Sequence, residues 1–261
     1  MTKKQILDAL EELAPLPLQD DFDNAGLQAG LTGDEVTGVL VCLDITEGIV
    51  DEALQLGCNL IISHHPLIFR PLRQVSDTTW QQRCVMKALL NGITVYSAHT
   101  NLDNAEGGVN YRIASLLGLE HLEWLQKKPQ TCGRSCGSGV IGTLPGPVDA
   151  ADFLATLKET FGVACLMHSA LPAEPLRKIA LCGGAGSFLM DEAKEKGADC
   201  FITGEMSYHH YFDADGMLLV AMGHYQSEQF TKDLLRDFLA SRFQGLRIEM
   251  TSLNTNPILY L

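Results

Sequence analysis

Long apolar runs and basic residues are both scarce in this sequence. No stretch approaches the roughly 18 consecutive apolar residues of a membrane span, and residues 1–14 have an amphipathic helical pattern instead of the apolar core of a signal peptide. Only 19 Lys and Arg stand against 32 Asp and Glu, and the net charge of -13 disfavours nucleic acid as a partner. We therefore expect a cytoplasmic protein that binds neither membranes nor nucleic acids.

The sequence also lacks a disulfide framework and the motifs of two large enzyme classes. Most of its eight cysteines lie inside apolar runs, which is typical of buried free thiols in a reducing compartment. Cys132 and Cys136 are close together, but no second pair or flanking histidine accompanies them, which disfavours a zinc or redox role. Neither the nucleophile elbow of serine hydrolases nor a Walker loop is present.

Apolar strands alternate with amphipathic helices along the chain, which indicates an α/β fold. With 46% hydrophobic residues the chain can bury a sizeable core. A glycine-rich segment around residues 132–146 is interpreted as a connection between two halves. The expected helices cover residues 3–14, 81–91, 149–161, 187–197 and 227–242, and a further helix capped by Thr46 or Asp44 ends at Gly57. The expected strands cover residues 39–43, 93–97, 178–182, 200–203 and 217–222, and the apolar run that includes Ile61–Ser63 is a further strand leading into His64.

An internal repeat supports this division. Residues 38–65 match residues 178–205 with an offset of 140 and six identities, and the apolar pattern agrees as well. The repeat continues where Gly92–His99 resembles Gly216–His224, and each histidine is followed four residues later by a carboxylate. We therefore expect two pseudo-symmetric α/β lobes with mixed sheets, residues 1–125 and 126–261, with a site in the cleft between them.

The segment Ser63-His64-His65-Pro66 is the strongest candidate for chemistry. An apolar strand ends there in two adjacent imidazoles, and Pro66 favours a turn that would let both serve one site. Residues just beyond the carboxyl ends of strands commonly build ligand sites in α/β sheets. Two surface loop histidines are the alternative, which the repeat disfavours.

Polar residues at equivalent strand ends supply a set of metal ligands. Three imidazoles and two carboxylates suit zinc, manganese, iron or cobalt better than calcium, and five ligands suit two divalent ions with one bridging carboxylate. Two such ions lower the pKa of a water between them, and they allow an acidic chain to hold an anionic substrate. The expected ligands are His64, His65, Asp103, His224 and Glu228, with Glu228 opening a helix and with His99 and Glu205 orienting ligands or moving protons.

Three other segments keep two interpretations each. Phe22–Leu27 has turn chemistry and could be purely structural or could have a functional role. The turn Gly183–Gly186 could seat a phosphate on its backbone N–H groups or could be a plain tight turn. Tyr208-His209-His210-Tyr211 could pack in an interface or could contact metal or substrate.

The ordered motifs resemble those of the Nif-three-like family, often labelled "GTP cyclohydrolase 1 type 2 homologue", which includes YbgI-type proteins. The segments that carry the resemblance are Phe22–Leu27, Ser63–Pro66, His99–Asp103, Gly204-Glu205 and Gly223–Glu228. The resemblance implies that His65 and Asp103 bind one ion, His64 and His224 the other, and Glu228 both. It also implies two similar α/β lobes and a homohexameric ring with its metal sites facing the interior. Longer members carry an inserted middle domain for which the spacing here leaves no room.

Two functions of different classes follow. The first is a metal-dependent hydrolase with a metal-bridging water, GTP cyclohydrolase-like or acting on another nucleotide or phosphate compound. In the cyclohydrolase version water attacks C8 of the guanine ring and His99 moves the proton. The second is a non-catalytic metal-binding ring scaffold or partner-binding protein.

Overall fold

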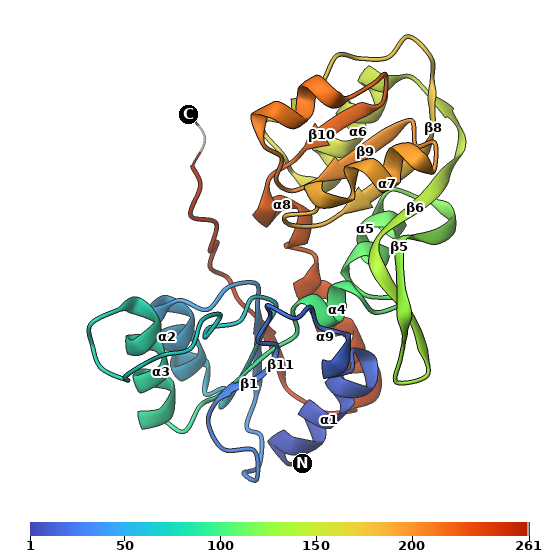
Figure 1. Cartoon of the computed structure of the whole chain (residues 1–261). Coiled ribbons are helices and arrows are strands. Elements are labelled where there is room, and N and C mark those ends of the chain that lie inside the picture. The colour runs from blue at the N-terminus through green and yellow to red at the C-terminus, as the bar shows by residue number, and fades with distance from the viewer. Residues whose placement is uncertain (260) are drawn as a thin grey trace. The chain divides into compact units, whose positions relative to one another are not determined.

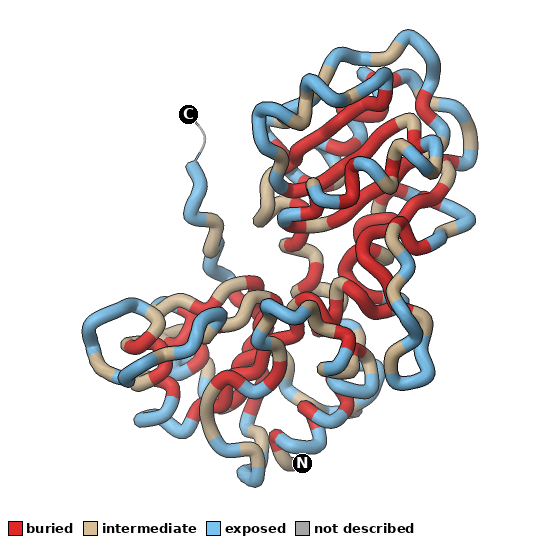
Figure 2. The backbone as a smooth tube through the Cα atoms, viewed as in Figure 1, coloured by how far each residue is buried: buried red, intermediate tan, exposed pale blue. Residues whose placement is uncertain are grey.

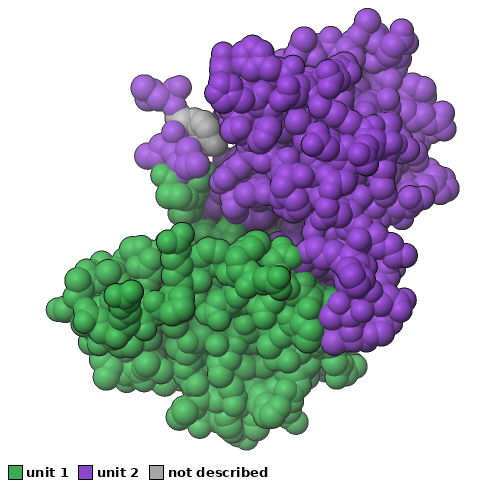
Figure 3. All heavy atoms as spheres, viewed as in Figure 1, with its two compact units in different colours: residues 1–102, 231–257 green, residues 103–230, 258–261 purple. Residues whose placement is uncertain are grey.

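The computed structural model describes residues 1–259 and 261. The chain forms two compact units, coloured separately in Figure 3. Unit 1 contains residues 1–102 and 231–257, and unit 2 contains residues 103–230 and 258–261. This division differs from the expected boundary between residues 125 and 126, which falls inside strand β5 (Glu120–Thr131). The difference arises because residues 103–125 pack within unit 2, whereas residues 231–257 add a helix and a strand to unit 1.

Unit 1 is a five-stranded mixed sheet with helices on both faces (Figure 1). Its strands, in spatial order, are β1 (Gly26–Ala29), β4 (Thr94–Ser97), β3 (Leu60–Ser63), β2 (Val39–Cys42) and β11 (Ile248–Met250). Only β1 is antiparallel to its neighbour. The helices are α1 (Lys3–Leu13), the short η1 (Leu16–Leu18), α2 (Glu47–Leu56), α3 (Trp80–Leu90) and α9 (Thr231–Arg242).

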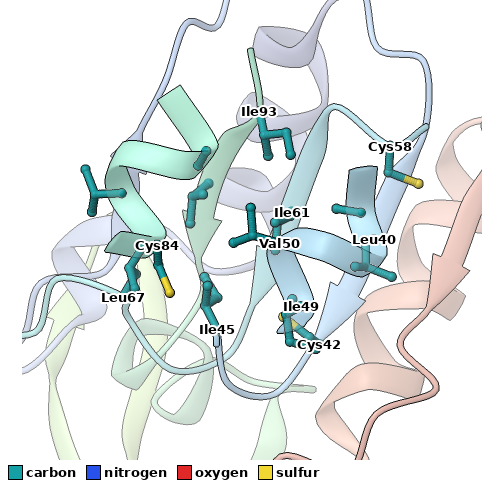
Figure 4. Close-up of a cluster of buried hydrophobic side chains, with 14 residues drawn as sticks. Leu40, Cys42, Ile45, Ile49, Val50, Cys58, Ile61, Leu67, Cys84 and Ile93 are labelled. Atoms are coloured by element: carbon teal, nitrogen blue, oxygen red, sulfur yellow. The ribbon is translucent and has the colours of Figure 1, made fainter. Parts of the chain in front are cut away.

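The core of unit 1 follows from its sequence pattern. Strands β2, β3 and β4 are buried at every position, as expected for parallel strands covered on both faces (Figure 2). Figure 4 shows the cluster in which Ile49 and Val50 of α2 pack against Leu40 and Ile61 of the sheet. Thr46, one of the two expected caps, begins α2 by accepting from the Ile49 N–H, and Gly57 ends it in the left-handed conformation, as expected.

Unit 2 is a six-stranded mixed sheet. Its strands, in spatial order, are β5, β6 (Arg134–Val148), β8 (Leu176–Cys182), β9 (Cys200–Thr203), β10 (Leu218–Ala221) and β7 (Met167–His168), and β8, β9 and β10 are parallel. The helices are α5 (Val109–Leu116), α6 (Ala150–Phe161), α7 (Met190–Glu195), α8 (His224–Glu228) and the short η2 (Ser187–Leu189) and η3 (Tyr208–Asp213). The single turn α4 (Thr100–Asp103) begins in unit 1 and ends at the first residue of unit 2. No helix among the described residues is long and apolar enough to cross a bilayer.

The glycine-rich segment 132–146 is not a connection, and that expectation was wrong. Most of it belongs to β6, which pairs with both β5 and β8. Its glycines allow close packing: a Cβ at Gly137 would meet the Trp124 ring, and one at Gly142 would meet Leu122 and the Glu120 carbonyl. Glycine therefore serves this strand where a side chain would collide with β5.

The expected helix over residues 227–242 is confirmed from Thr231 to Arg242 as α9, but its start is wrong, because residues 227 and 228 belong to the separate helix α8. Between them, Gln229 donates to the Phe161 carbonyl oxygen at 3.0 Å, and the Phe230 ring lies against the Phe161 ring. These contacts hold residues 229 and 230 to α6 of unit 2, whereas α9 packs on β2 and β11 of unit 1. Glu228 consequently ends a helix instead of opening one.

The structure confirms the two similar α/β halves. Val39 pairs with Leu60 in unit 1, and Ile179 pairs with Cys200 in unit 2, so the register is the same at the offset of 140. A side-chain hydrogen bond is repeated at the same offset: Asn59 accepts from the Thr37 N–H at 2.9 Å, and Asp199 accepts from the Arg177 N–H at 2.8 Å.

Candidate metal centre

Three imidazoles gather at one edge of the unit 1 sheet. His64 and His65 directly follow β3, and His99 follows β4 by two residues. The two strands are parallel with Ser63 opposite Ser97, so their carboxyl ends meet at the same edge. One ligand nitrogen from each of the three rings lies within 4.8 Å of the others. The chain therefore turns after Ser63 as predicted, and both adjacent histidines contribute to the same group of potential metal ligands.

Each of these rings is held through Nδ1. The Nδ1 of His64 lies 2.8 Å from the Ala98 carbonyl oxygen. The Nδ1 of His65 lies 2.6 Å from Oδ1 of Asp44, and that of His99 lies 2.7 Å from Oδ1 of Asp23. Carbonyl and carboxylate oxygens accept, so Nδ1 donates in all three pairs and Nε2 carries the lone pair. An outer carboxylate or carbonyl on Nδ1 with Nε2 presented is the usual arrangement of metal-binding histidines.

Asp23 is held in its ionised form. Burial raises the pKa of its carboxyl, but the hydrogen bond and charge of His99, with hydrogen bonds from Thr100 and the Asn24 N–H, bring the pKa below its ordinary value. Its side chain is fully buried. Asp23 lies in the segment Phe22–Leu27, whose turn chemistry therefore also orients an imidazole.

Asp44 has the same role for His65. Burial raises the pKa of this carboxyl, but His65 and the Thr255 hydroxyl lower it by hydrogen bonding, and the net pKa is below the ordinary value. Sequence reasoning missed the roles of Asp23 and Asp44. For Asp44 a signal existed, because it follows the end of β2, whose carboxyl end lies beside that of β3.

Unit 2 presents a second group at its own strand ends. β10 ends at Ala221, and His224 begins α8 after Gly223, whose φ of 101° a side-chain-bearing residue rarely adopts. Oε1 of Glu205 lies 2.8 Å from Nδ1 of His224, and Oε2 of Glu228 lies 3.1 Å from Nε2. Glu228 is 4% exposed. Glu205 thus holds His224 from outside, in keeping with one of its two expected roles.

Asp103 belongs to the same group in unit 2. A carboxylate oxygen of Asp103 and one of Glu228 lie within 4.8 Å of each other. Two carboxylates this close repel unless a proton or a cation lies between them. The donors present, imidazole Nε2 atoms and carboxylates, fit a divalent transition metal.

The turn Gly183–Gly186 is a plain turn that makes room for Glu228. Its N–H groups are used internally: Gly183 donates to Asn110, Gly184 to Ser227 and Gly186 to Thr203. A Cβ at Gly184 would collide with the carboxylate of Glu228. These observations disfavour the phosphate interpretation.

The second histidine pair lies apart from these groups. Tyr208, His209 and Phe212 contact one another in η3, and Tyr208 and Phe212 are largely exposed. Neither His209 nor His210 joins a metal-binding group among the described residues. All eight cysteines are free, with Cys132 exposed and Cys136 buried.

Comparison with known proteins now identifies the family. A model of the Duf34/NIF3 (NGG1p interacting factor 3) family matches residues 1–257. The chain belongs to this family. A Lactococcus lactis relative named "GTP cyclohydrolase 1 type 2 homolog" is 36% identical over 252 residues, which is 95% of each chain. A Clostridium acetobutylicum relative of the same name is 32% identical over 227 residues, 86% of this chain and 84% of its own.

Solved structures agree with the family assignment. The crystal structure of a Bacillus cereus protein related to NIF3 superposes with a TM-score of 0.90 at 26% identity, covering 100% of this chain and 99% of the other. The expected family and the mixed α/β fold are thereby confirmed. This NIF3 chain has histidine and carboxylate groups that can hold a metal ion.

Proposed function

We propose that this NIF3-family protein holds two divalent metal ions and uses them to hydrolyse a small-molecule substrate. The proposed ligands are His64, His65, Asp103, His224 and Glu228. The observation that carries the proposal is that the three proposed histidine ligands, His64, His65 and His224, are each held at Nδ1 by an outer carbonyl or carboxylate oxygen, the usual arrangement of metal-binding histidines.

We further propose that both units serve the same pair of ions. His64 and His65 of unit 1 bring two imidazoles and no carboxylate ligand, whereas unit 2 supplies the carboxylates of Asp103 and Glu228 with a single imidazole, His224. Together they make three imidazoles and two carboxylates, a set that suits two divalent ions. The equivalence of the two halves, which places both sets at strand ends of the same register, supports this sharing.

The proposed chemistry is hydrolysis. Two bound divalent ions supply Lewis acidity, which lowers the pKa of water and polarises an electrophilic carbon or phosphorus. His99 is the proposed proton carrier, because its ring adjoins those of His64 and His65 and its Nδ1 is fixed by buried Asp23. A nucleotide or another phosphate compound is the proposed substrate, and the names of the relatives make GTP the first to test. The proposed setting is a homohexameric ring in the cytoplasm.

The test is turnover by protein purified without chelator or immobilised nickel and loaded in turn with zinc, manganese, iron and cobalt. The panel contains GTP, phosphoesters and cyclic amidines. We expect metal-dependent turnover that falls at least about 100-fold in His99→Gln while the metal content is retained. Turnover of phosphoesters alone would exclude the cyclohydrolase version. A protein with two ions per chain and no turnover of any compound would favour a metal-holding scaffold.

A further inference from the structure

A pocket of about 720 Å³ lies in unit 1 directly after the histidine pair. The loop that follows His65 and the first turn of α3 form it, and its lining includes Phe69, Arg70, Arg73 and Trp80. Pro66, the residue after His65, also lines it. The pocket therefore begins one residue from a proposed metal ligand.

The loop is fixed next to the imidazoles. Asn24 donates to the Ile68 carbonyl oxygen at 2.6 Å, and the Ile68 N–H donates to Gln28 at 3.0 Å. These contacts place Phe69 against His99, with ring centroids 6.1 Å apart in an edge-to-face arrangement. The segment around Asn24 thus holds both the pocket loop and, through Asp23, the His99 ring.

The charged residues that line the pocket are positive, whereas the chain as a whole is negative. Arg70 and Arg73 line it, and no carboxylate is among its lining residues in the described chain. Neither guanidinium forms an ion pair with any described residue, whereas Arg83, just beyond the pocket, is bound to Glu47. In a chain of net charge -13, two unpaired arginines in one concave site are positioned to receive an anion.

The pocket also offers an aromatic surface. Trp80 is 47% exposed and Phe69 42% exposed, although both are large apolar side chains. Exposed aromatic rings beside guanidinium groups suit a ligand with a planar ring and phosphate groups.

We propose that this pocket binds a nucleotide-class substrate, with Arg70 and Arg73 on its phosphate groups and Trp80 stacked on its base. The inference rests on the proposed function, because it supplies the substrate for hydrolysis at the adjacent metal centre. The base and the phosphate groups of the substrate would then be recognised by residues of unit 1 that are not metal ligands.

The experiment measures nucleotide binding to the full chain after removal of metals with EDTA, so that phosphate cannot bind through an ion. The chain has two tryptophans, and Trp124 is buried at 7% exposure, so quenching of Trp80 reports occupancy of the pocket. The probes are GTP, guanosine and inorganic triphosphate. Variants Arg70→Ala and Arg73→Ala are compared with Arg177→Ala, an exposed arginine of unit 2 outside the pocket. Circular dichroism is measured for each protein, and the metal content of each is measured before EDTA treatment.

We expect GTP to quench Trp80 fluorescence saturably, and each pocket arginine variant to weaken GTP binding at least about tenfold, although its metal content before EDTA treatment equals that of the wild type. Arg177→Ala should bind GTP as the wild type does. Trp80→Ala should weaken GTP binding, measured calorimetrically, more than triphosphate binding. Wild-type affinity in both pocket variants, or an equal loss in Arg177→Ala, would overturn the proposal. Arginine-dependent GTP binding by a protein that held no metals before EDTA treatment, and takes up none when zinc, manganese, iron or cobalt is added back, would instead refute the proposed metal centre alone.

Discussion

At the scale of single residues, the site depends on which ring nitrogen of each imidazole is held by an outer acceptor. Asp44 and Asp23 hold His65 and His99 through Nδ1 across 21 and 76 positions of sequence. The histidines were predictable, because each follows an apolar strand. Asp23 was not assigned this role, because a hydrogen bond between residues so distant leaves no local pattern.

Asp44→Asn tests the outer contact of His65. The negative charge of Asp44 keeps the proton of His65 on Nδ1 and makes Nε2 of the same ring more basic. The variant removes this charge, so we expect metal affinity to fall about 10- to 100-fold. A calorimetric titration of each protein with metal measures this affinity. Asp191→Asn, an exposed carboxylate on α7, is the control and should bind metal as the wild type does. Unchanged affinity in Asp44→Asn would remove His65 from the proposed ligands.

Gly184→Ala tests the room made for Glu228. Gly184 has a φ of 59°, so alanine costs about 1 to 2 kcal/mol of stability, and its Cβ would also displace the Glu228 carboxylate. Gly197→Ala is a matched control, because Gly197 has a φ of 67° and no neighbour within 4 Å of a built Cβ. Both variants should lose similar stability in thermal unfolding, but only Gly184→Ala should lose metal. Equal metal contents would show that Gly184 does not position Glu228.

At the scale of elements, the sequence predicts long periodic segments better than short or unusual ones. Helix α2 and its caps follow from Thr46, an apolar face and Gly57. Strand β6 was missed because its glycines were interpreted as a connection between the halves, whereas they allow β6 to pack closely against β5. Strand β11 was also missed, since three residues carry too little pattern and their partner β2 lies some 200 residues earlier.

The residues after β11 are tied to α2 by Glu52. Its carboxylate accepts from the Ser252 N–H at 2.8 Å and from the hydroxyls of Ser252 and Thr251. Burial raises the pKa of Glu52, but these hydrogen bonds outweigh it and the pKa is below the ordinary 4.5. A lowered folded-state pKa stabilises the fold above pH 4.5, and this contribution is lost as the pH falls through the folded-state pKa.

Glu52→Gln should therefore lower the free energy of unfolding at pH 7 by at most about 1 kcal/mol, because solvent screens this partly exposed carboxylate, and the difference from wild type should shrink as the pH falls below 4.5. Urea unfolding of both proteins across pH 3.5 to 7 checks the sign. A difference that grows on acidification would contradict the role of the ionised carboxylate.

At the scale of the whole molecule, the repeat was the strongest sequence signal. A constant offset of 140 predicted both halves and the strand ends at which His65 and Glu205 stand. The return of residues 231–257 to unit 1 was not predictable, because no local pattern indicates which of the two sheets α9 will pack on. The shared dinuclear centre is the proposal that links the halves.

Metal stoichiometry per chain in Glu228→Ala tests this central proposal most directly. Wild type should hold two ions, His65→Ala should lose one more readily than the other, and Glu228→Ala should lose both, because the bridge and its charge are gone. Glu195→Ala, an exposed carboxylate at the end of α7, should keep two ions. Elemental analysis beside circular dichroism gives the answer: a folded Glu228→Ala protein with no ions is the predicted result, and one that keeps two ions per chain would contradict the bridging role and the shared centre.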